Sequence, residues 1–407
     1  MNFKDIVNLF KNKKLLVITN GYPSKDGKIP NCTFVKHRLD ALQNFFKKIV
    51  VISPTSYFPK FLANTNIFPT SYEDVTKLEH YKYNNIEVYF PKYLNIPYSF
   101  FLERRGDWVF FFLKRFIKRL DIDFDFIHAY FTWFSGYLSM RLSRMTKKPY
   151  FLTIQENRNW FLEIYTSNRE KYYQIWGNAK KLIRVNKRDV PLLKRFNKST
   201  VSLPNGYNNK IFKNLNKENC KEKLGIPNDK KILLHVGSYI QNHKNQLTII
   251  RACNLLRHKI KDFICYLVGE GEDRILFQKE IEKLNLEKHI KLIGRIPNKY
   301  IPIWMNAANL FIFPSHAEGN PTVVVEAMAC GLPIIGSKGG GMDEIIIEDE
   351  IGYILNDEDD EIELMEKILK GLDKKWEYEK IFDEAKKYSQ KNLSRKLLRI
   401  YFESLNF

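Results

Sequence analysis

Short apolar runs alternate with amphipathic segments along the whole chain. An apolar run bounded by turn residues is typical of a buried strand, whereas apolar residues spaced three and four apart predict a helix. Their alternation predicts an α/β fold with parallel sheets. In the first half, the predicted strands are Lys14–Thr19, Lys48–Ile52, Asp125–Tyr130, Tyr150–Ile154, Lys181–Val185 and Thr200–Leu203, and the predicted helices include Phe34–Phe46, Trp133–Arg144 and Lys187–Phe196.

The same pattern starts again after a turn at Pro204-Asn205-Gly206 and a polar stretch that runs to Asp229. Since 407 residues exceed what one hydrophobic core usually supports, we predict two doubly wound domains, residues 1–205 and 206–389. Ligands of such sheets bind at the carboxyl ends of the strands. In the second half, the predicted strands are Ile232–Val236, Phe263–Val268, Ile290–Ile293, Leu310–Phe313 and Pro333–Gly336.

The positive charge is concentrated in the first half of the chain. Residues 1–200 contain 35 Lys or Arg and 16 Asp or Glu, a net charge of +19, whereas residues 201–407 contain 31 and 30, a net charge of +1. This asymmetry predicts an anionic partner for the first domain. Nucleic acid and an anionic membrane surface both meet that requirement.

The segment Asp107–Leu120 places aromatic and basic residues at helical spacing. An ordinary helix packed on the sheet and a helix lying on a membrane surface both fit this pattern. The basic residues of this region are Arg104, Arg105, Lys114, Arg115, Lys118 and Arg119.

The five cysteines are scattered and form no C-x-x-C pair, so neither a zinc site nor a disulfide framework is predicted. The first residues lack the apolar core of a signal peptide, and no run has the ~18 apolar residues that a spanning helix needs. We therefore expect a reduced, cytoplasmic setting, with peripheral attachment to the inner face of the cell membrane as an option.

Two glutamates stand eight positions apart in the sequence SHAEGNPTVVVEAMAC, residues 315–330. Glu318 follows a predicted strand and therefore falls in a loop at its carboxyl end, while Glu326 lies on the next predicted helix. Pro321 is a favourable first helical residue. The amides at the start of this helix form a ready site for a phosphate group.

With the following Gly331-Leu332-Pro333, this segment resembles the pattern E-G-x-P-x-x-x-x-E-A-x-A-x-G-x-P of the retaining GT-B glycosyltransferases, the E-x7-E or group 1 family. The resemblance implies two Rossmann-like domains facing across a cleft, with a final helix, about residues 390–407, crossing back onto the first. It also implies that Glu318 contacts the donor sugar and that Glu326 binds the ribose of a nucleotide-diphosphate sugar. The residues implied to lie around the phosphates are Gly319, Asn320, Pro321, Thr322 and Val323.

The segment Leu234–Asn245, LHVGSYIQNHKN, resembles the family's strand and glycine loop that precede a phosphate-binding lysine. The resemblance assigns Lys244 to the leaving diphosphate and places Gly237 beside the donor. An arginine commonly follows this glycine in the family, but Ser238 stands here. One of the two cations that usually contact the diphosphate is therefore absent from its usual place.

Three further residues are assigned to the donor site by resemblance. Gly269, in LVGEG, matches a strand-end loop beside the nucleotide, and Ile296, in IGRI, matches the element that meets the base. Gly27 matches the glycine of the family's first loop, although a plain connection between a strand and a helix also explains that glycine.

On the acceptor side, the sequence FDFIHAYFTWFSG resembles the family's D-x-I-H-A-H strand end. His128 matches the first histidine, often a supporting residue, and Tyr130 replaces the second, which faces the reaction centre in the family. A buried histidine with a purely structural role explains His128 equally well.

Asp121-Ile122-Asp123-Phe124-Asp125 contains D-x-D, which holds a divalent cation in the other major glycosyltransferase fold. Asp125, however, coincides with the aspartate that precedes the I-H-A strand of the GT-B family, and an oxygen-ligated cation needs more convergent ligands than one strand edge offers. We therefore predict no metal and no cofactor.

The sequence thus predicts a metal-independent, retaining glycosyltransferase that moves a sugar to a glycan or lipid-linked acceptor in cell-surface polysaccharide or glycoconjugate synthesis. Ser238 and Tyr130 leave open a pseudoenzyme that binds nucleotide sugars without transfer. A nucleotide-sugar epimerase shares the fold, and an RNA-binding protein would explain the charge, although no RNA-binding signature is present.

Overall fold

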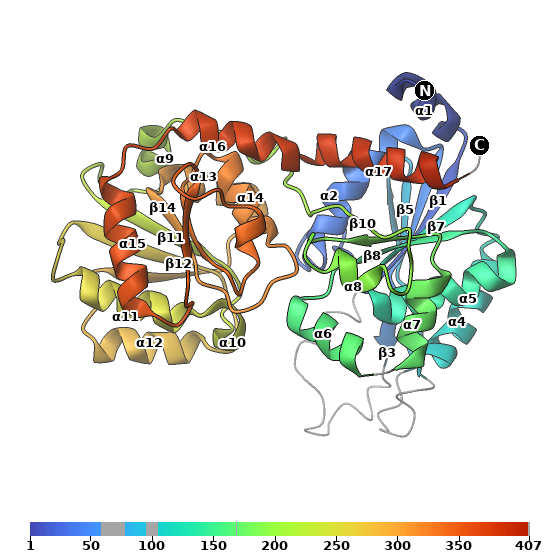
Figure 1. Cartoon of the computed structure of the whole chain (residues 1–407), viewed down its shortest axis with the longest axis horizontal. Coiled ribbons are helices and arrows are strands. Elements are labelled where there is room, and N and C mark those ends of the chain that lie inside the picture. The colour runs from blue at the N-terminus through green and yellow to red at the C-terminus, as the bar shows by residue number, and fades with distance from the viewer. Residues whose placement is uncertain (58–77, 95–104, 168, 406–407) are drawn as a thin grey trace. The chain divides into compact units, whose positions relative to one another are not determined.

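The computed structural model describes residues 1–57, 78–94, 105–167 and 169–405, and the chain divides into two compact units (Figure 1). Unit 1 comprises residues 1–156, 160–203 and 394–407, and unit 2 comprises residues 157–159 and 204–393. The change from one unit to the other at residues 203 and 204 lies beside the turn at Pro204-Asn205-Gly206.

Unit 1 is built on a mainly parallel sheet whose described strands follow the order β10-β9-β8-β7-β1-β2-β5-β4. Only the pairing of β4 with β5 is antiparallel among the described pairs of this sheet. A two-stranded parallel sheet, β3 with β6, accompanies it. The strands are β1 (Lys14–Thr19), β2 (Lys48–Ile52), β3 (Thr55–Tyr57), β4 (Tyr81–Tyr83), β5 (Ile86–Tyr89), β6 (Lys92–Leu94), β7 (Phe126–Tyr130), β8 (Tyr150–Ile154), β9 (Lys181–Arg184) and β10 (Val201–Ser202).

Helices bury apolar side chains against this sheet. On α4, Val109, Leu113 and Ile117 recur at spacings of four, and they share a core with residues of β1 and β2. Tyr401 of the last helix contacts the rings of Phe126 and Phe151. The helices are α1 (Phe3–Phe10), α2 (Thr33–Leu42), α4 (Arg105–Arg119), α5 (Tyr137–Thr146), α6 (Arg158–Thr166), α7 (Glu170–Asn178), α8 (Val190–Leu193) and α17 (Gln390–Ser404).

Unit 2 has a parallel sheet with the strand order β13-β12-β11-β14-β15-β16. Its strands are almost wholly apolar, as expected when helices cover both faces of a parallel sheet. The strands are β11 (Lys231–Val236), β12 (Phe263–Val268), β13 (Ile290–Gly294), β14 (Leu310–Phe313), β15 (Ile334–Ser337) and β16 (Gly352–Leu355). The helices are α9 (Lys217–Lys223), α10 (Gln241–Lys244), α11 (Gln246–Leu256), α12 (Arg274–Lys283), α13 (Ile301–Ala307), α14 (Thr322–Ala329), α15 (Glu361–Asp373) and α16 (Tyr378–Ala385).

The predicted α/β class with two doubly wound sheets is confirmed. One predicted helix begins late, because residues 132–136 form a wide turn and α5 starts only at Tyr137. The predicted helix at Lys187–Phe196 is reduced to α8. None of the described helices is long and apolar enough to cross a membrane.

Candidate functional site

The residues that the sequence predicted around the donor gather mainly at the carboxyl edge of the unit 2 sheet. Gly237 and Ser238 follow β11, Gly269 follows β12, and Ile296 lies two residues after β13. Glu318 lies in the loop after β14. Since β13, β12, β11 and β14 are neighbours in that order, these four loops lie side by side. Gly27 belongs to unit 1, where it occupies an exposed turn after β1 with a φ of +72°.

Backbone segments approach one another closely in these loops. A Cβ placed on Gly269 would lie 1.8 Å from the carbonyl oxygen of Gly237, and the φ of Gly269 is +154°. A Cβ on Gly271 would lie 2.4 Å from the carbonyl oxygen of Tyr239. These glycines therefore allow the loops after β11 and β12 to touch, which no side chain would permit.

Lys244 and Glu318 meet in an ion pair, although 74 positions separate them. Both side chains are largely buried, with exposed fractions of 19% and 16%. The Lys244 ammonium also lies 5.1 Å from the centre of the Phe313 ring. A cation and a carboxylate predicted to act on the same donor are thus brought together at one edge of the sheet.

Ser315 holds this pair in place, a role that the sequence did not reveal. It is fully buried, and its Oγ lies 2.6 Å from the carbonyl oxygen of His243 and 3.0 Å from Oε1 of Glu318. Its own carbonyl oxygen accepts a hydrogen bond from Ser337 Oγ at 2.6 Å. The serine stands at the start of the two-glutamate motif, which was the available signal.

The side chain of Ser238 is exposed, and its carbonyl oxygen accepts a hydrogen bond from Nε2 of Gln246 at 2.7 Å. Gln246 also lies 3.3 Å from Nε2 of the buried His235. Because serine carries no charge, Lys244 supplies the positive charge in this loop. The loop is anchored through its backbone rather than through the side chain of Ser238.

The amino end of α14 lies in the same region. Pro321 is its N-cap and gives no side-chain cap, so the first amides, those of Thr322 and Val323, have no partner within the helix. Asn320 fixes the preceding loop, because its Oδ1 accepts a hydrogen bond from the Asn205 amide at 2.8 Å. Gly319 lies between this anchor and Glu318. The geometry suits an anionic group in front of the helix.

Glu326 lies on α14 with only 8% of its surface exposed. Burial raises the pKa of its carboxyl to about 8, because a low-dielectric surrounding disfavours the charged form. Near neutral pH this group therefore retains its proton in the free protein. A carboxyl in this state can donate one hydrogen bond and accept others, as the binding of a diol would require.

The raised pKa makes the stability of the fold pH-dependent. Between the ordinary pKa of 4.5 and about 8, unfolding releases the Glu326 proton, so the free energy of unfolding falls as the pH rises and levels off above about 8. We expect Glu326→Gln to remove this pH dependence. From pH 5 to pH 8 the melting temperature of the variant should therefore rise relative to that of the wild type. Parallel melting-temperature profiles would contradict the assignment, and the exposed Glu287→Gln is the control.

In unit 1, His128 is fully buried and both of its ring nitrogens are occupied. Nδ1 bonds to the hydroxyl of Tyr401 and Nε2 lies 2.7 Å from Oγ1 of Thr153. Burial, with a further contribution from Arg38, lowers the pKa of the imidazole to about 3. This environment favours a neutral, positioning histidine over one that touches a substrate.

Tyr130 stacks on His128 with 4.5 Å between ring centres. It is 3% exposed, and its hydroxyl has no hydrogen-bond partner among the described residues. Burial raises the pKa of this hydroxyl to about 12, so it stays protonated and can act as a donor. The structure thus places Tyr130 at the carboxyl end of β7 as a neutral group.

Glu156 is a buried carboxylate beyond the end of β8 that the sequence did not single out as a site residue. Its Oε1 accepts a hydrogen bond from the amide of Thr132 at 2.5 Å, and burial raises its pKa. Nearby, Arg184 donates to the carbonyl oxygens of Ile154 and Glu156 at 3.1 and 2.8 Å. Glu156 and Arg184 therefore fix the loops that end β7 and β8.

A cavity of about 340 Å³ lies at the carboxyl ends of β1 and β2 in unit 1. None of its described lining residues carries a charge, and Ser135 Oγ donates to Oδ1 of Asn20 at 2.6 Å inside it. Amides, hydroxyls and aromatic rings are the groups that bind neutral hydroxylated ligands. The polar and aromatic residues of the lining are Asn20, Tyr22, Asn31, Ser53, Thr55, Ser56, Tyr93, Phe134 and Ser135.

The aspartates of the D-x-D sequence lie at the opposite, amino edge of the unit 1 sheet. Asp123 pairs with Lys14 at 2.7 Å and with Lys148 at 3.3 Å. Asp125 accepts a hydrogen bond from the backbone amide of Lys14 at 2.7 Å. Their carboxylates therefore neutralise lysines and stabilise the start of β1 and β7.

The chain is similar in sequence to known glycosyltransferases. Residues 216–388 match the family model "Glycosyl transferases group 1". A Bacillus subtilis (strain 168) protein provisionally named as the teichuronic acid biosynthesis glycosyltransferase TuaC is 27% identical over 339 residues, which cover 82% of each chain.

Solved structures agree over nearly the whole chain. Sucrose-phosphate synthase from Thermosynechococcus elongatus superposes with a TM-score of 0.75 at 18% identity, covering 96% of this chain and 99% of that one. Anabaena HepE in complex with UDP and glucose gives a TM-score of 0.71 at 17% identity, covering 97% and 100%. Residues 216–388 thus match the group 1 glycosyltransferase family, and the chain as a whole has the GT-B fold.

Proposed function

We propose that unit 2 binds a nucleotide-diphosphate sugar at the carboxyl edge of its sheet and that the enzyme transfers the sugar with retention to a glycan or lipid-linked acceptor. The observation that carries the proposal is the meeting of Lys244 and Glu318 beside closely packed glycine loops. HepE, which shares the fold, is described in complex with UDP-glucose. Thermal stability measured with a panel of UDP-, GDP- and ADP-sugars tests donor binding, because a bound ligand stabilises the folded state by mass action.

Stabilising the departing diphosphate is the main task of such a site. The Lys244 ammonium supplies a positive charge in a largely buried position, where it acts more strongly than in water. The first amides of α14, at Thr322 and Val323, supply further donors. In the free protein Glu318 neutralises Lys244, so donor binding would exchange one anionic partner of the lysine for another.

Glu318 is the proposed partner of the donor sugar and of the charge that develops on it. Ser315 positions its carboxylate through a 3.0 Å contact with Oε1. In a same-face transfer the leaving phosphate itself helps to remove the proton of the acceptor hydroxyl, so no protein nucleophile is required. Glu326, protonated near neutral pH, would bind the ribose hydroxyls.

The uncharged cavity in unit 1 is the proposed place of the acceptor. Its amide, hydroxyl and aromatic lining fits a neutral sugar residue. A similar protein is named for teichuronic acid biosynthesis, and WaaG, which shares the fold, is described as involved in lipopolysaccharide biosynthesis. We therefore propose a role in the synthesis of a cell-surface polysaccharide or glycoconjugate.

A pseudoenzyme is the second candidate, and one observation favours it. Ser238 supplies no charge, and in the free protein the Lys244 charge is already neutralised by Glu318. Such a protein would be stabilised by a nucleotide sugar but would neither transfer nor release its sugar. A coupled assay of nucleoside diphosphate release in the presence of acceptor separates the two candidates, because only the transferase would release it.

We predict that transfer survives an excess of EDTA. Lys244 and the α14 amides provide the positive potential for the diphosphate, and the D-x-D carboxylates are engaged with Lys14 and Lys148. The measurement is the initial rate with and without chelator, with and without added Mn²⁺. Loss of activity with EDTA that Mn²⁺ restores would contradict metal independence.

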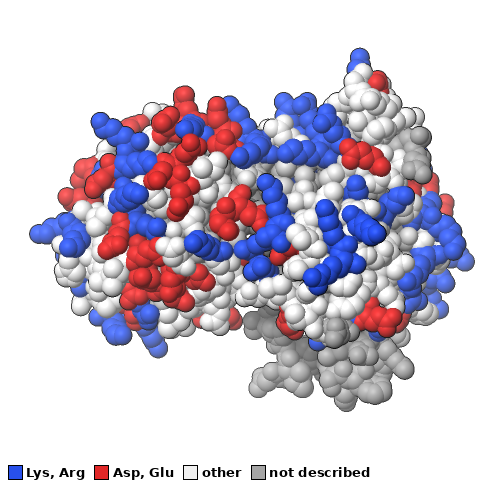
Figure 2. All heavy atoms as spheres, in the orientation of Figure 1, with Lys and Arg blue, Asp and Glu red and all other residues white. Residues whose placement is uncertain are grey.

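We propose that unit 1 also docks on an anionic membrane surface. Figure 2 shows more Lys and Arg than Asp and Glu side chains on its visible face, whereas the two signs are more evenly mixed on unit 2. On α4, Trp108 and Phe111 are 37% and 43% exposed and their rings stack at 6.2 Å. Exposed aromatic rings beside basic residues are typical of surfaces that insert shallowly into lipid headgroups. Arg104, predicted to belong to this surface, lies outside the described residues.

Binding to anionic liposomes should exceed binding to neutral ones and weaken with salt, because salt screens surface charges. Replacing Lys114, Arg115, Lys118 and Arg119 together by glutamine should weaken the partition by at least about ten-fold, since each basic residue near the surface contributes about 1 kcal/mol. Donor binding should be unchanged. Sedimentation with the liposomes is the assay, and equal partition onto both kinds would remove the membrane proposal.

A further inference from the structure

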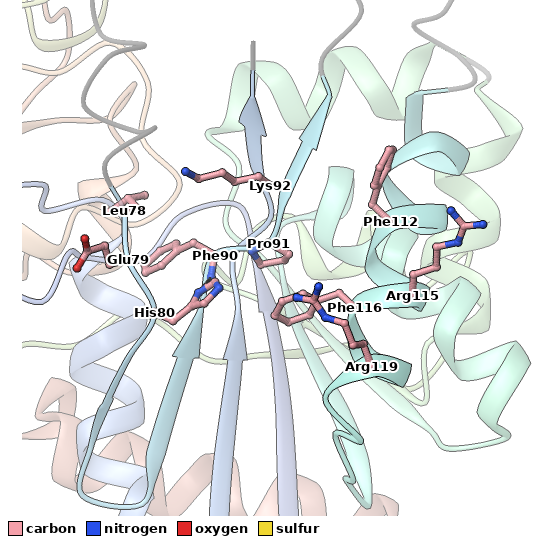
Figure 3. Close-up of a pocket in the computed structure, with 10 residues that line it drawn as sticks. All are labelled: Leu78, Glu79, His80, Phe90, Pro91, Lys92, Phe112, Arg115, Phe116 and Arg119. Carbon is pink, nitrogen blue, oxygen red and sulfur yellow. Dashed lines mark hydrogen bonds between the residues drawn. The ribbon is translucent and has the colours of Figure 1, made fainter. Parts of the chain in front are cut away.

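A second cavity of unit 1, of about 650 Å³, lies between the segment that leads into β4, the junction of β5 and β6, and α4 (Figure 3). The described residues that line it combine cations with aromatic rings. The six that matter most are His80, Lys92, Phe112, Arg115, Phe116 and Arg119. Glu79 is the only carboxylate among the described residues of the lining.

Three cationic side chains line this cavity. Lys92, Arg115 and Arg119 come from two separate elements, and within the described part of the chain none of them has an ion-pair partner. The pKa of His80 is lowered, first by burial and then by the charges of Lys92 and Arg119. Both charges therefore act at the same imidazole, and with three cations against the one carboxylate of Glu79 the described lining carries a net positive charge.

His80 adds a neutral donor to this set. Its Nδ1 accepts a hydrogen bond from the backbone amide of Phe90 at 2.9 Å, which leaves the proton of the neutral ring on Nε2. The ring lies 5.9 Å from that of Phe116, which holds its orientation. Lysine, arginine and imidazole N–H groups are the donors that bind phosphate oxygens.

The apolar part of the cavity continues onto the exposed surface of α4. Phe112 lines the cavity and contacts the ring of Trp108 at 5.0 Å. The Arg115 guanidinium lies 4.0 Å above the ring of Phe111. Aromatic surface thus runs without a break from the cavity to the exposed rings of Trp108 and Phe111. A ligand held there by its charge would find apolar contacts for an attached chain.

We propose that this cavity binds the phosphate group of a single anionic lipid, with Lys92, Arg119 and His80 as its donors and Phe112 and Trp108 beside the acyl chain. In addition to the diffuse charged surface proposed above, unit 1 would thus have a defined site for a lipid headgroup. This inference rests on the proposed membrane docking but not on the transfer reaction. A free phosphate ester would share the charge contacts but gain nothing from the aromatic rings.

The test is a calorimetric titration of the full chain with monomeric dihexanoylphosphatidic acid, glycerol 3-phosphate and dihexanoylphosphatidylcholine. We expect the phosphatidic acid to bind, glycerol 3-phosphate to bind more weakly and phosphatidylcholine not to bind. Arg119→Gln and Lys92→Gln should each weaken phosphatidic acid binding about ten-fold, the effect of losing one charge-assisted hydrogen bond. Phe112→Ala should weaken the phosphatidic acid but not glycerol 3-phosphate.

Lys118→Gln and Lys114→Gln are the matched controls, because they remove the same charge from the same helix outside the cavity lining. Equal losses of affinity for phosphatidic acid in all four charge variants would indicate diffuse electrostatic attraction and contradict a defined site. Equal binding of glycerol 3-phosphate and phosphatidic acid would overturn the lipid assignment. Anionic liposome binding without any binding of monomeric lipid would reject the cavity site while keeping membrane docking. The thermal unfolding transition of each variant reports that it is folded.

Discussion

Replacement of Lys244 by glutamine is expected to lower kcat by about 100- to 1,000-fold, the usual effect of removing one group that stabilises charge in a transition state. The ammonium is largely buried, lies over the Phe313 ring and reaches the carboxylate of Glu318. Because it would face charge that grows on the leaving diphosphate, its loss should act on turnover more than on donor binding. The measurement is the single-turnover rate at saturating donor.

The partner residues separate this role from a simple loss of structure. Glu318→Gln should also lower kcat, whereas Glu326→Gln should mainly weaken donor binding. Because Lys244 and Glu318 contact each other, their effects should not add. The kcat of the double variant should be little lower than that of the less active single variant. Lys230→Gln removes a partly exposed lysine, paired with Asp262 at the amino edge, and should leave the rate unchanged. Wild-type rates for both Lys244 and Glu318 variants would show that the site is wrongly assigned.

The second large effect concerns the stability of unit 1. Arg184 and Asp189 form an ion pair with no exposed surface on either side chain, and two guanidinium nitrogens lie 2.7 and 3.0 Å from Oδ2 of Asp189. Asp189→Ala would leave a buried guanidinium without its counter-ion. Breaking a buried pair in this way typically costs about 3–5 kcal/mol, and we expect a loss of this size in chemical denaturation followed by tryptophan fluorescence.

Two comparisons define the cause of that loss. Lys48→Ala breaks a partly exposed pair with Glu87 and should cost no more than about 1 kcal/mol. Asp189→Asn retains a hydrogen-bond acceptor and should cost less than Asp189→Ala. If Asp189→Ala and Lys48→Ala destabilised equally, the buried pair would not be the support of the loops after β8 and β9.

Most of the sheet strands could be predicted because long apolar runs between turn residues leave little choice. β1, β2, β8, β12 and β14 have the predicted bounds. The strands β3 to β6 were not predicted, since they have only three or four residues each. Single short segments of this kind carry too weak a periodic signal.

The candidate donor site could be proposed by resemblance, because the residues assigned to it fall in short local motifs. The contact between Lys244 and Glu318 joins two such motifs, and the family pattern had already placed both at the donor. The surroundings of His128 were not predictable, because its hydroxyl partner Tyr401 lies near the end of the sequence. The two cavities of unit 1 are likewise assembled from segments with no shared motif.

The partnership of His128 with Tyr401 has a consequence for the order in which the chain folds on the ribosome. The two residues are 273 positions apart, and Tyr401 also packs on Phe126 and Phe151 in the sheet of unit 1. The aromatic layer on this side of the sheet is therefore incomplete until α17 has been synthesised. Unit 2 ends at Leu393, in the first turn of that helix, and so precedes Tyr401 in the sequence. Domains usually fold in the order of synthesis. Here unit 2 can complete its fold first, and the core of unit 1 stays incomplete until α17 packs on it.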